Sequence, residues 1–372
     1  MKSNKPKVLI ITDWYFPGYK AGGPIQSVHR LANQLSEKVD LKIITRDRDL
    51  NLEVKYSGIE SDKWFNKDGY QVLYCSKQQE LDFIKKELEK KSHDKVYLNS
   101  FFSFRYSLFP LFHAYRNGML KKIILAPRGM LGEGALKIKP LKKKFLIVVF
   151  KLLRIHQEIV FHSTDKSETS SIRKVFQGNI NVAEIGNFPA KVSEQKHLPK
   201  SDEAKFVFAS RISPKKNLHF LLRILFGTNI NLSVFGAIDD KQYEVQCRKY
   251  LTDYVSLNDA ITPEDLMKVF HEKHFFILPT LNENFGHAII EALACGCPVI
   301  ISDQTPWNDL ESFGAGWVIS LADEDRWKLV ISMANGMEQS DYLRMSERAK
   351  EYVSSKFNFA ELRQQYLKLF SE

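Results

Sequence analysis

The sequence has few cysteines and no long apolar run. Only four cysteines occur among 372 residues, and Cys295 and Cys297 form the one close pair. No second pair offers the spacing of a metal site, so we interpret the cysteines as small buried thiols in a reducing compartment. No segment approaches the roughly 18 apolar residues of a membrane-spanning helix. A transmembrane protein is therefore not expected.

The amino terminus lacks the apolar core of a signal peptide. It starts with basic residues, but the apolar run that follows, Val8 to Ile11, is only four residues long. Such a run is too short for a signal peptide and indicates a first strand. We therefore expect a cytoplasmic protein, or one that is peripheral at the inner face of the plasma membrane.

Acidic residues are too few to balance the basic ones. The formal net charge is +10 and the isoelectric point about 9.2, a balance that favours nucleotide phosphates, anionic lipid or nucleic acid as partners. Residues 137–155 contain seven basic residues and no acidic one. Aromatic residues do not alternate with basic ones along one strand, so no nucleic-acid partner is expected. A non-catalytic protein that binds anionic polymers is the weakest alternative.

The length allows two α/β domains of ordinary size. A strand at 8–12, a helix at 25–37 and a strand at 41–45 begin the first domain, and a similar pattern begins again at 206–210. The polar, lysine-rich segment 190–204 with Pro199 is typical of a linker. We therefore expect one domain at 1–195 and a second at 196–356. Residues 357–372 would cross back to the first domain.

Three further segments carry expectations about local structure. The charged segment 47–67 is expected to be irregular and to lie at the surface. A helix is expected at 163–176, capped by Ser163, Thr164 or Asp165 with Glu168 in its first turns. The segment 135–155 is expected to form one long helix, broken early by Pro140. Its apolar residues cover more than one face and lysines flank them, which indicates either a membrane-surface helix or a core helix with a basic flank.

The most informative stretch is Pro279 to Ile301. An apolar strand at 275–278 ends at Pro279, a polar loop follows, a helix is expected at 288–293, and the next strand begins at Cys297. Such a loop lies at the carboxyl end of a parallel strand, where open α/β sheets bind ligands. The unpaired N–H groups at the start of a helix suit oxygen-rich or anionic groups.

Two carboxylates frame this loop. Glu283 lies in it, and Glu291 lies eight residues further on, about a turn and a half into the helix. Carboxylates so far apart cannot share a proton, but they can hold two parts of one extended ligand. An isolated pair with this spacing would more often be a capping residue and a solvated helix residue.

A glycine loop follows the first strand. Gly22 and Gly23 precede the helix at 25–37, where the start of a helix can meet a phosphate. The pattern is not Gly-x-Gly-x-x-Gly, so a dinucleotide fingerprint is absent.

The stretch at 279–301 as a whole resembles the donor-site signature of retaining glycosyltransferases with the GT-B fold, glycosyltransferase family 4. The resemblance implies an α/β fold with two Rossmann-like domains facing a cleft. It implies that Arg211 and Lys216 bind the donor diphosphate, since charge-assisted bonds to phosphate oxygens call for two cations. The family often has a glycine at the place of Asn217. The loop at Gly22 and Gly23 would approach the same diphosphate.

The resemblance assigns the other ligand contacts as well. Glu291 would accept hydrogen bonds from the ribose hydroxyls. Glu283, with the loop at Asn284, would hold the donor sugar together with the backbone N–H groups of three residues, namely Phe285, Gly286 and His287. No cofactor and no metal are implied, because the two cations take that role.

Arg128 departs from the family pattern. It follows a strand at 123–126, at a place where much of the family has a histidine over the donor sugar. An arginine stays protonated and cannot act as a general base. Its planar fork could hold a phosphate or an acceptor carboxylate. The alternative is a loop arginine that closes the end of a helix.

The function expected from this resemblance is a retaining transfer of a hexose. The donor would be a UDP- or GDP-sugar, and the acceptor a glycan or a polyprenyl-linked sugar in the synthesis of a capsule or O-antigen. An epimerase acting on nucleotide sugars is the enzymic alternative. It would convert the donor with no acceptor present.

Overall fold

The computed structural model describes residues 5–137, 140–195 and 203–372. The chain forms two compact units, one made of Met1–Phe188 with Phe359–Glu372 and the other of Pro189–Asn358. The expected borders lay at 195/196 and 356/357, and part of the expected linker, 196–202, lies outside the described residues.

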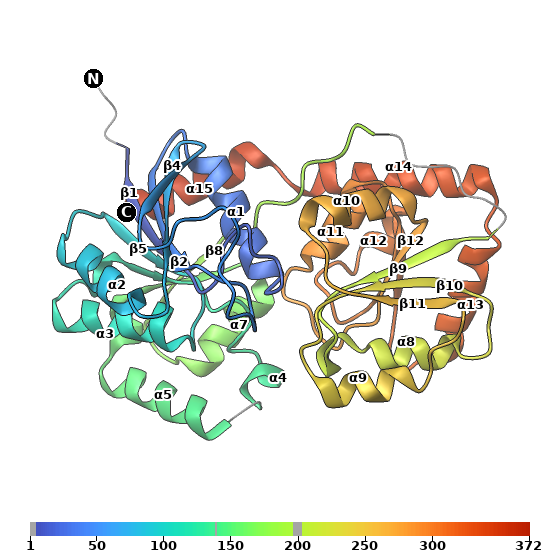
Figure 1. The fold of residues 1–372 in the computed structure, drawn as a ribbon, viewed down its shortest axis with the longest axis horizontal. Coiled ribbons are helices and arrows are strands. Elements are labelled where there is room, and N and C mark those ends of the chain that lie inside the picture. Colours follow the sequence, from blue (N-terminus) through green and yellow to red (C-terminus); the bar gives the residue numbers. More distant parts are fainter. Residues whose placement is uncertain (1–4, 138–139, 196–202) are drawn as a thin grey trace. The chain divides into compact units, whose positions relative to one another are not determined.

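The first unit is built on an eight-stranded sheet with helices on both faces (Figure 1). The strand order is β3-β4-β2-β1-β5-β6-β7-β8, and every pairing is parallel except that of β3 with β4. The strands are β1 (Lys7–Ile11), β2 (Asp40–Arg46), β3 (Trp64–Lys67), β4 (Tyr70–Cys75), β5 (Lys95–Leu98), β6 (Ile123–Leu125), β7 (Val160–Ser163) and β8 (Asn181–Glu184).

The strands of this sheet are buried because side chains on each face pack under helices. Val8 and Ile10 of β1 belong to one apolar cluster, and Leu9 and Ile11 belong to the cluster on the other face. This alternation is what a strand with period two produces. The helices and helical turns of the unit are α1 (Gly23–Leu35), α2 (Glu80–Glu89), η1 (Phe104–Leu108), α3 (Phe109–Arg116), η2 (Leu120–Lys122), α4 (Glu133–Leu136), α5 (Pro140–Leu152), α6 (Ile155–Glu158), α7 (Lys166–Val175) and α15 (Phe359–Ser371).

The last helix, α15, completes the first unit although it ends the chain. Its Tyr366, Leu369 and Phe370 are buried in the same cluster as residues of α1 and β1. The Tyr366 hydroxyl donates to the backbone carbonyl of Gly186 at 3.2 Å. The return of the C-terminal helix to the first unit thus rests on buried aromatic packing.

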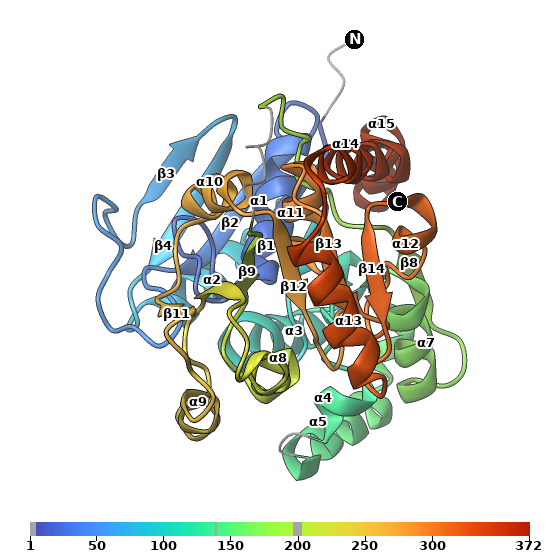
Figure 2. The same cartoon turned by 90° about the vertical axis from the view of Figure 1, so that its right-hand side faces the viewer.

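The second unit is a six-stranded, wholly parallel sheet in the order β11-β10-β9-β12-β13-β14. Figure 2 shows β12, β13 and β14 side by side. The strands are β9 (Lys205–Ala209), β10 (Asn231–Phe235), β11 (Val255–Asn258), β12 (Phe275–Leu278), β13 (Val299–Ser302) and β14 (Gly316–Ile319). Its helices and helical turns are η3 (Pro214–Lys216), α8 (Leu218–Leu225), α9 (Lys241–Arg248), α10 (Pro263–Glu272), α11 (His287–Ala294), α12 (Leu310–Phe313), α13 (Glu324–Asn335) and α14 (Gln339–Lys356).

Each sheet has a point where the order of its strands reverses. In the second unit the chain adds β10 and β11 on one side of β9, then returns to add β12 on the other side. In the first unit the same reversal lies between β1 and β5. Ligands of open α/β sheets bind outside the carboxyl ends of the strands at such a point.

Two expectations about local structure were wrong, and a third was confirmed. The segment 47–67 is not wholly irregular, because β3 pairs with β4 through a turn at Asp68 and Gly69, both with positive φ. The segment 135–155 is not one helix. Pro140 begins α5, as a residue without an N–H group can, and Arg154, with φ of 52°, separates α5 from α6. The helix expected at 163–176 is α7, and its expected cap is confirmed: the Asp165 side chain accepts from the N–H of Glu168, and the helix begins at Lys166.

Candidate functional site

The loop after β9 carries the two predicted cations. Arg211 is the second residue after the strand, and Lys216 ends the helical turn η3. Asn217 has φ of 58° and links this turn to α8. Glycine adopts a left-handed backbone conformation most easily, and asparagine is next. This explains why Asn217 can occupy the position where the resemblance leads us to expect glycine.

The loop after β12 is held on two sides. The backbone carbonyl of Lys215 accepts from the Leu281 N–H at 2.8 Å and from the Thr280 hydroxyl at 3.1 Å. On the other side, the Glu283 N–H donates to the carbonyl of Gln304 at 2.9 Å. These bonds fix Glu283 beside the cationic loop.

Lys216 and Glu283 form an ion pair, with the Lys216 ammonium donating to Glu283 Oε2. Both side chains are 13% exposed. Burial raises the pKa of the Glu283 carboxyl. The positive charges of Lys216, Lys215 and Arg211 lower it by more than burial raises it, so the net pKa lies below its ordinary value. Glu283 is therefore an anion among three cations, and Lys216 is held in place when no ligand is bound.

Arg211 has a different partner. Its guanidinium donates to Asp239 Oδ2 at 2.9 Å, and the two side chains are 39% and 35% exposed. An exposed pair of this kind is weak. A phosphate group could therefore replace Asp239 as the partner of Arg211 at little cost.

The start of α11 follows the second loop. Gly286 has φ of 74°, and a Cβ there would lie 2.8 Å from Ile289 Cδ1, so the position needs glycine. Phe285 is buried, and its carbonyl accepts from Trp307 Nε1 at 2.6 Å. His287 is the first residue of the helix, and its ring lies 4.7 Å from that of Phe285.

Glu291 lies on the same helix, four residues after its start, and is only 6% exposed. The second unit thus brings Arg211, Lys216 and Glu283 together and leads directly from them into the helix of Glu291. Asn284 lies in the same loop, between Glu283 and Phe285.

Gly22 and Gly23 belong to the first unit, at the start of α1. Gly22 has φ of 71° and ψ of −130°, a conformation open in practice only to glycine. No atom lies within 4 Å of where its Cβ would be, so the backbone angle is the reason for glycine there.

Arg128 also belongs to the first unit, at the carboxyl end of β6. Its guanidinium donates to Asn99 Oδ1 at 2.7 Å, to Asn187 Oδ1 at 2.8 Å and to the Tyr97 hydroxyl at 2.8 Å. These partners are neutral, and no carboxylate of the described residues lies at hydrogen-bond distance from its guanidinium. It closes no helix end through these bonds. Asn99 and Tyr97 hold it at the edge of the sheet.

The described residues show neither a disulfide bond nor a metal centre. All four cysteines are free and buried. Among the described residues, no group of three or more His, Cys, Asp and Glu side chains is placed to hold a metal ion. No helix in the described part of the chain is long and apolar enough to cross a bilayer.

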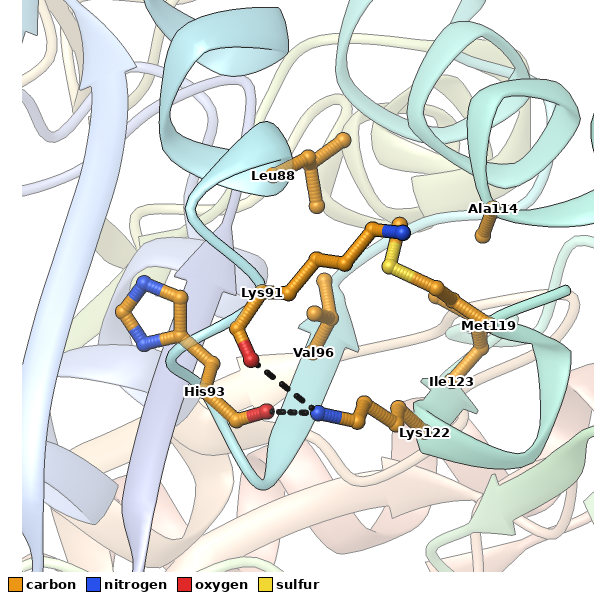
Figure 3. A pocket seen from close by; sticks show the side chains of 8 residues that line it. All are labelled: Leu88, Lys91, His93, Val96, Ala114, Met119, Lys122 and Ile123. Carbon is orange, nitrogen blue, oxygen red and sulfur yellow. Dashed lines mark hydrogen bonds between the residues drawn. The ribbon is translucent and has the colours of Figure 1, made fainter. Parts of the chain in front are cut away.

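A small pocket lies in the first unit, near the amino ends of β5 and β6 (Figure 3). Its lining is mainly apolar, and the Lys122 ammonium beside it donates to the carbonyls of His93 at 2.7 Å and Lys91 at 3.3 Å. None of the predicted site residues lines it.

Sequence reasoning did not identify several polar partners. Asp239, which accepts a hydrogen bond from Arg211, follows β10 and lies 28 residues from Arg211 in the sequence. Asp13 and Arg46 meet at the carboxyl ends of β1 and β2. Each of these residues lies within four residues of the carboxyl end of a strand, which was the available signal for both groups.

Comparison with known proteins finds similarity to glycosyltransferases. Residues 190–352 match the family model described as "Glycosyl transferases group 1". The O-antigen chain mannosyltransferase RfbU of Salmonella typhimurium is 25% identical over 167 residues. This match covers 43% of the present chain and 46% of that protein, so less than half of the relative is spanned.

A longer match is the alpha-monoglucosyldiacylglycerol synthase of Streptococcus pneumoniae. It is 25% identical over 338 residues, covering 83% of this chain and 74% of that protein. Among solved structures, Anabaena HepE in complex with UDP and glucose aligns with a TM-score of 0.72 at 14% identity, over 98% of this chain and 99% of that one. The predicted resemblance to glycosyltransferases, surface-polysaccharide enzymes among them, is confirmed at the level of group 1 glycosyltransferases, and the GT-B fold class is confirmed with it.

Proposed function

We propose that this chain, whose residues 190–352 match the group 1 glycosyltransferases, transfers a hexose with retention of configuration. The donor would be a UDP- or GDP-sugar, and the acceptor a glycan or polyprenyl-linked sugar of a bacterial surface polysaccharide. The observation that carries the proposal is the Lys216–Glu283 pair at the start of α11, with Arg211 close enough to lower the pKa of Glu283.

In this proposal the cations act on the leaving group. Negative charge builds on the diphosphate as the bond to the sugar breaks, and positive groups placed there in advance stabilise that charge. Lys216 has three donors, so it can bind a phosphate oxygen while it still contacts Glu283. Arg211 would exchange its exposed partner Asp239 for the phosphate.

The remaining residues would position the donor. Glu283 and the N–H groups at 285–287 would bind the sugar hydroxyls, with Asn284 in the same loop. Glu291 would bind the ribose. Gly22 and Gly23 would let the backbone approach the diphosphate, and Arg128, whose charge has only neutral partners, would bind an anionic group of the acceptor or the donor.

The test is a product assay with the full-length protein and a panel of nucleotide sugars. Donor consumption and the anomeric configuration of the product are followed by NMR, with and without a lipid-linked oligosaccharide extract. We expect consumption that depends on acceptor and a product with the configuration of the donor. Conversion of the donor to its epimer without acceptor would favour the epimerase instead.

We also propose that α5 attaches the protein to an anionic membrane surface at the inner face of the plasma membrane. Its exposed apolar residues recur at intervals of four, three and four, which places them on one face of the helix. They are Leu141, Phe145, Val148 and Leu152, exposed by 82%, 68%, 52% and 76%. The opposite face is anchored by Phe150, which is fully buried.

The charges around this face match anionic lipid. Lys142, Lys144 and Lys151 are exposed on the same helix, and no acidic residue occurs between 137 and 155. Apolar side chains beside lysines are typical of helices that lie in a membrane interface. Such a position would suit an acceptor carried on lipid.

Vesicle flotation tests the membrane proposal. The full-length protein should float with vesicles of phosphatidylglycerol and phosphatidylcholine, and a Phe145→Glu variant should float much less. The matched control is Leu329→Glu, which changes an exposed apolar residue of α13. Equal flotation of all three proteins, or flotation of none, would contradict the proposal.

A further inference from the structure

The loop after β13 lies against the loop after β12 and contacts it on both sides of Asn284. The carbonyl of Gln304 accepts from the Glu283 N–H at 2.9 Å, and Trp307 Nε1 donates to the carbonyl of Phe285 at 2.6 Å. The strands that precede the two loops are parallel neighbours, so their carboxyl ends meet at one edge of the sheet (Figure 2). The proposed function gives a role to Glu283 and Phe285 but none to Trp307.

Trp307 is fixed by the residues around it. Its own backbone N–H donates to the Thr305 hydroxyl at 3.3 Å. Its ring centre lies 5.4 Å from that of Phe285, 5.7 Å from that of Phe357 and 6.5 Å from that of Tyr352. All three pairs meet edge to face, an arrangement that aromatic rings favour. Phe357 also contacts Phe285, with their ring centres 6.0 Å apart, so the three rings form one packed group.

The end of the loop after β13 is tied to α14. The Tyr352 hydroxyl donates to Asp309 Oδ1 at 2.6 Å, and the Lys356 ammonium forms an ion pair with Asp309 Oδ2. Helix α14 is bound in turn to the end of α11, because the Ser346 hydroxyl donates to the carbonyl of Gly296 at 2.6 Å. The loop therefore stands on a helix and does not depend on its own backbone alone.

The hydrogen bond from Trp307 fixes one particular peptide group. The Phe285 carbonyl and the Gly286 N–H belong to the same trans peptide, which is planar, so the two groups point in opposite directions. Gly286 has φ of 74°. Glycine adopts positive and negative φ about equally readily, so this peptide could turn over with little strain. The indole bond selects the orientation in which the Gly286 N–H points away from Trp307.

Gly286 lies beside Glu283. A Cβ on Gly286 would lie 3.1 Å from Glu283 Cγ. The proposed function assigns both groups to the donor sugar, with the Gly286 N–H as a donor and the Glu283 carboxylate as an acceptor. If the peptide turned over, the Phe285 carbonyl would replace the N–H, and the sugar would meet two acceptors. The orientation set by Trp307 is therefore the one that offers the sugar both kinds of partner.

We infer that Trp307 is a positioning residue, whose indole holds the Phe285–Gly286 peptide so that the Gly286 N–H is presented to the sugar of the donor. The inference rests on the proposed function, in which the N–H groups at 285–287 bind the sugar and the cations bind the diphosphate. Loss of the indole bond should therefore weaken binding of the sugar and leave binding of the diphosphate intact.

Calorimetric titration of the full-length protein tests this difference. UDP-glucose, GDP-mannose, UDP and GDP are titrated into the wild type and into Trp307→Phe, which removes the indole N–H but keeps an aromatic ring. Affinity for the nucleotide sugar that the wild type binds should fall about fivefold, since one neutral hydrogen bond is lost. Affinity for the matching free diphosphate should not change. A residue with a purely structural role would change both affinities alike.

Two control variants make the same substitution elsewhere in the second unit. Trp317→Phe alters a half-buried tryptophan of β14, and Trp327→Phe removes an indole bond to the carbonyl of Ser320 at 3.1 Å. Both should bind nucleotide sugar as the wild type does. Thermal melting shows whether each variant is folded. If Trp307→Phe is not, Phe357→Leu replaces it, because it removes a ring that packs on Trp307 and should cause the same selective loss to a smaller extent.

The indole N–H signal of Trp307 provides a second readout. A sugar hydroxyl that accepts from the Gly286 N–H polarises the peptide and strengthens the bond from Trp307 to its carbonyl. The NMR spectrum of the protein with isotope-labelled tryptophan shows this signal, which is identified by its absence from Trp307→Phe. It should move downfield on addition of the nucleotide sugar and not on addition of the free diphosphate.

The outcomes separate the inference from the proposed function. The inference is wrong if Trp307→Phe binds the nucleotide sugar as the wild type does, or if it loses affinity equally for the free diphosphate. An indole signal that the nucleotide sugar does not move would also contradict it. In each of these cases the wild type still binds nucleotide, and the proposed function stands. Absence of nucleotide binding by the wild type would refute the proposed function itself, and the inference with it.

Discussion

Lys216 and Glu283 were predicted as two separate ligand contacts, but the structure pairs them with each other. The pairing has a physical reason. Both side chains are mostly buried, and a buried charge without a partner is costly. In the absence of ligand, each side chain neutralises the other and keeps it in its rotamer. A donor diphosphate would then meet a lysine that is already oriented, which lowers the cost of binding.

This pairing leads to a prediction for Lys216→Ala. Glu283 would lose its nearest cation, so we expect a loss of roughly 3 kcal/mol in the free energy of unfolding. Turnover should fall by about two orders of magnitude, because a group that stabilises developing charge is removed. Steady-state kinetics and urea denaturation measure the two effects.

Lys215→Ala serves as the control for Lys216→Ala. The side chain of Lys215 is exposed, and its backbone carbonyl, which holds the loop after β12, is unaffected by the change. Its turnover should fall much less. Equal turnover of Lys216→Ala and wild type would remove Lys216 from the mechanism.

At the scale of elements, the sequence predicted most helices and strands because their apolar periodicity is strong. The strand at 275–278 has the predicted bounds, and the helix expected at 288–293 differs from α11 by one residue at each end. The predictions failed where pairing with another segment determines the secondary structure. An example is β3, which forms a strand because it pairs with β4. The donor-loop residues could be predicted from motif order. Their hydrogen bonds to Lys215 and Gln304 could not, since these join segments about 65 and 20 residues apart.

The turn between η3 and α8 provides a second prediction. Asn217 has φ of 58°. At this angle glycine has no steric strain, whereas alanine is strained by about 1 kcal/mol. We expect Asn217→Gly to leave the free energy of unfolding unchanged or raise it by a few tenths of a kcal/mol. Asn217→Ala should lower it by about 1 kcal/mol, as measured by urea denaturation. A larger loss in the glycine variant than in the alanine variant would mean that the side chain, not the backbone angle, matters here.

Within the first unit, a buried polar chain links Arg128 to the strand that precedes the crossing to the second unit. The Tyr97 hydroxyl accepts from Arg128 and donates to His162 Nδ1 at 2.7 Å, and His162 Nε2 donates to the carbonyl of Ile185 at 2.9 Å. This tautomer follows because a carbonyl can only accept. Burial, then Arg128, lowers the pKa of His162 to about 3.

The lowered pKa of His162 makes stability depend on pH. The unfolded chain would bind a proton at His162 below about pH 6.5, whereas the folded chain would not until about pH 3. The contribution of the neutral His162 to the free energy of unfolding is therefore fully present above pH 6.5 and is lost as the pH falls toward 3. Between pH 6 and 4, the wild type should lose about 1.4 kcal/mol per pH unit more than His162→Gln, which can form both hydrogen bonds without titrating. Urea denaturation at several pH values measures this difference, and identical slopes would contradict the neutral, buried imidazole.

At the scale of the whole molecule, the two units are proposed to have separate roles. The second unit carries the two cations and two carboxylates predicted to hold the donor, and the first carries Arg128 and the glycine loop. The sequence indicated the donor residues because their loops have a recognisable order. It did not indicate the contact between Asp13 and Arg46, which come from the ends of two strands and share no local pattern.

The most direct test is calorimetric titration of the full-length protein with UDP-glucose, GDP-mannose and the free diphosphates, repeated with Glu291→Ala. The account predicts that the wild type binds at least one nucleotide sugar. It also predicts that Glu291→Ala binds the same ligand at least tenfold more weakly, because a carboxylate that accepts from the ribose is lost. No binding of any nucleotide by the wild type, or unchanged affinity in Glu291→Ala, would contradict it.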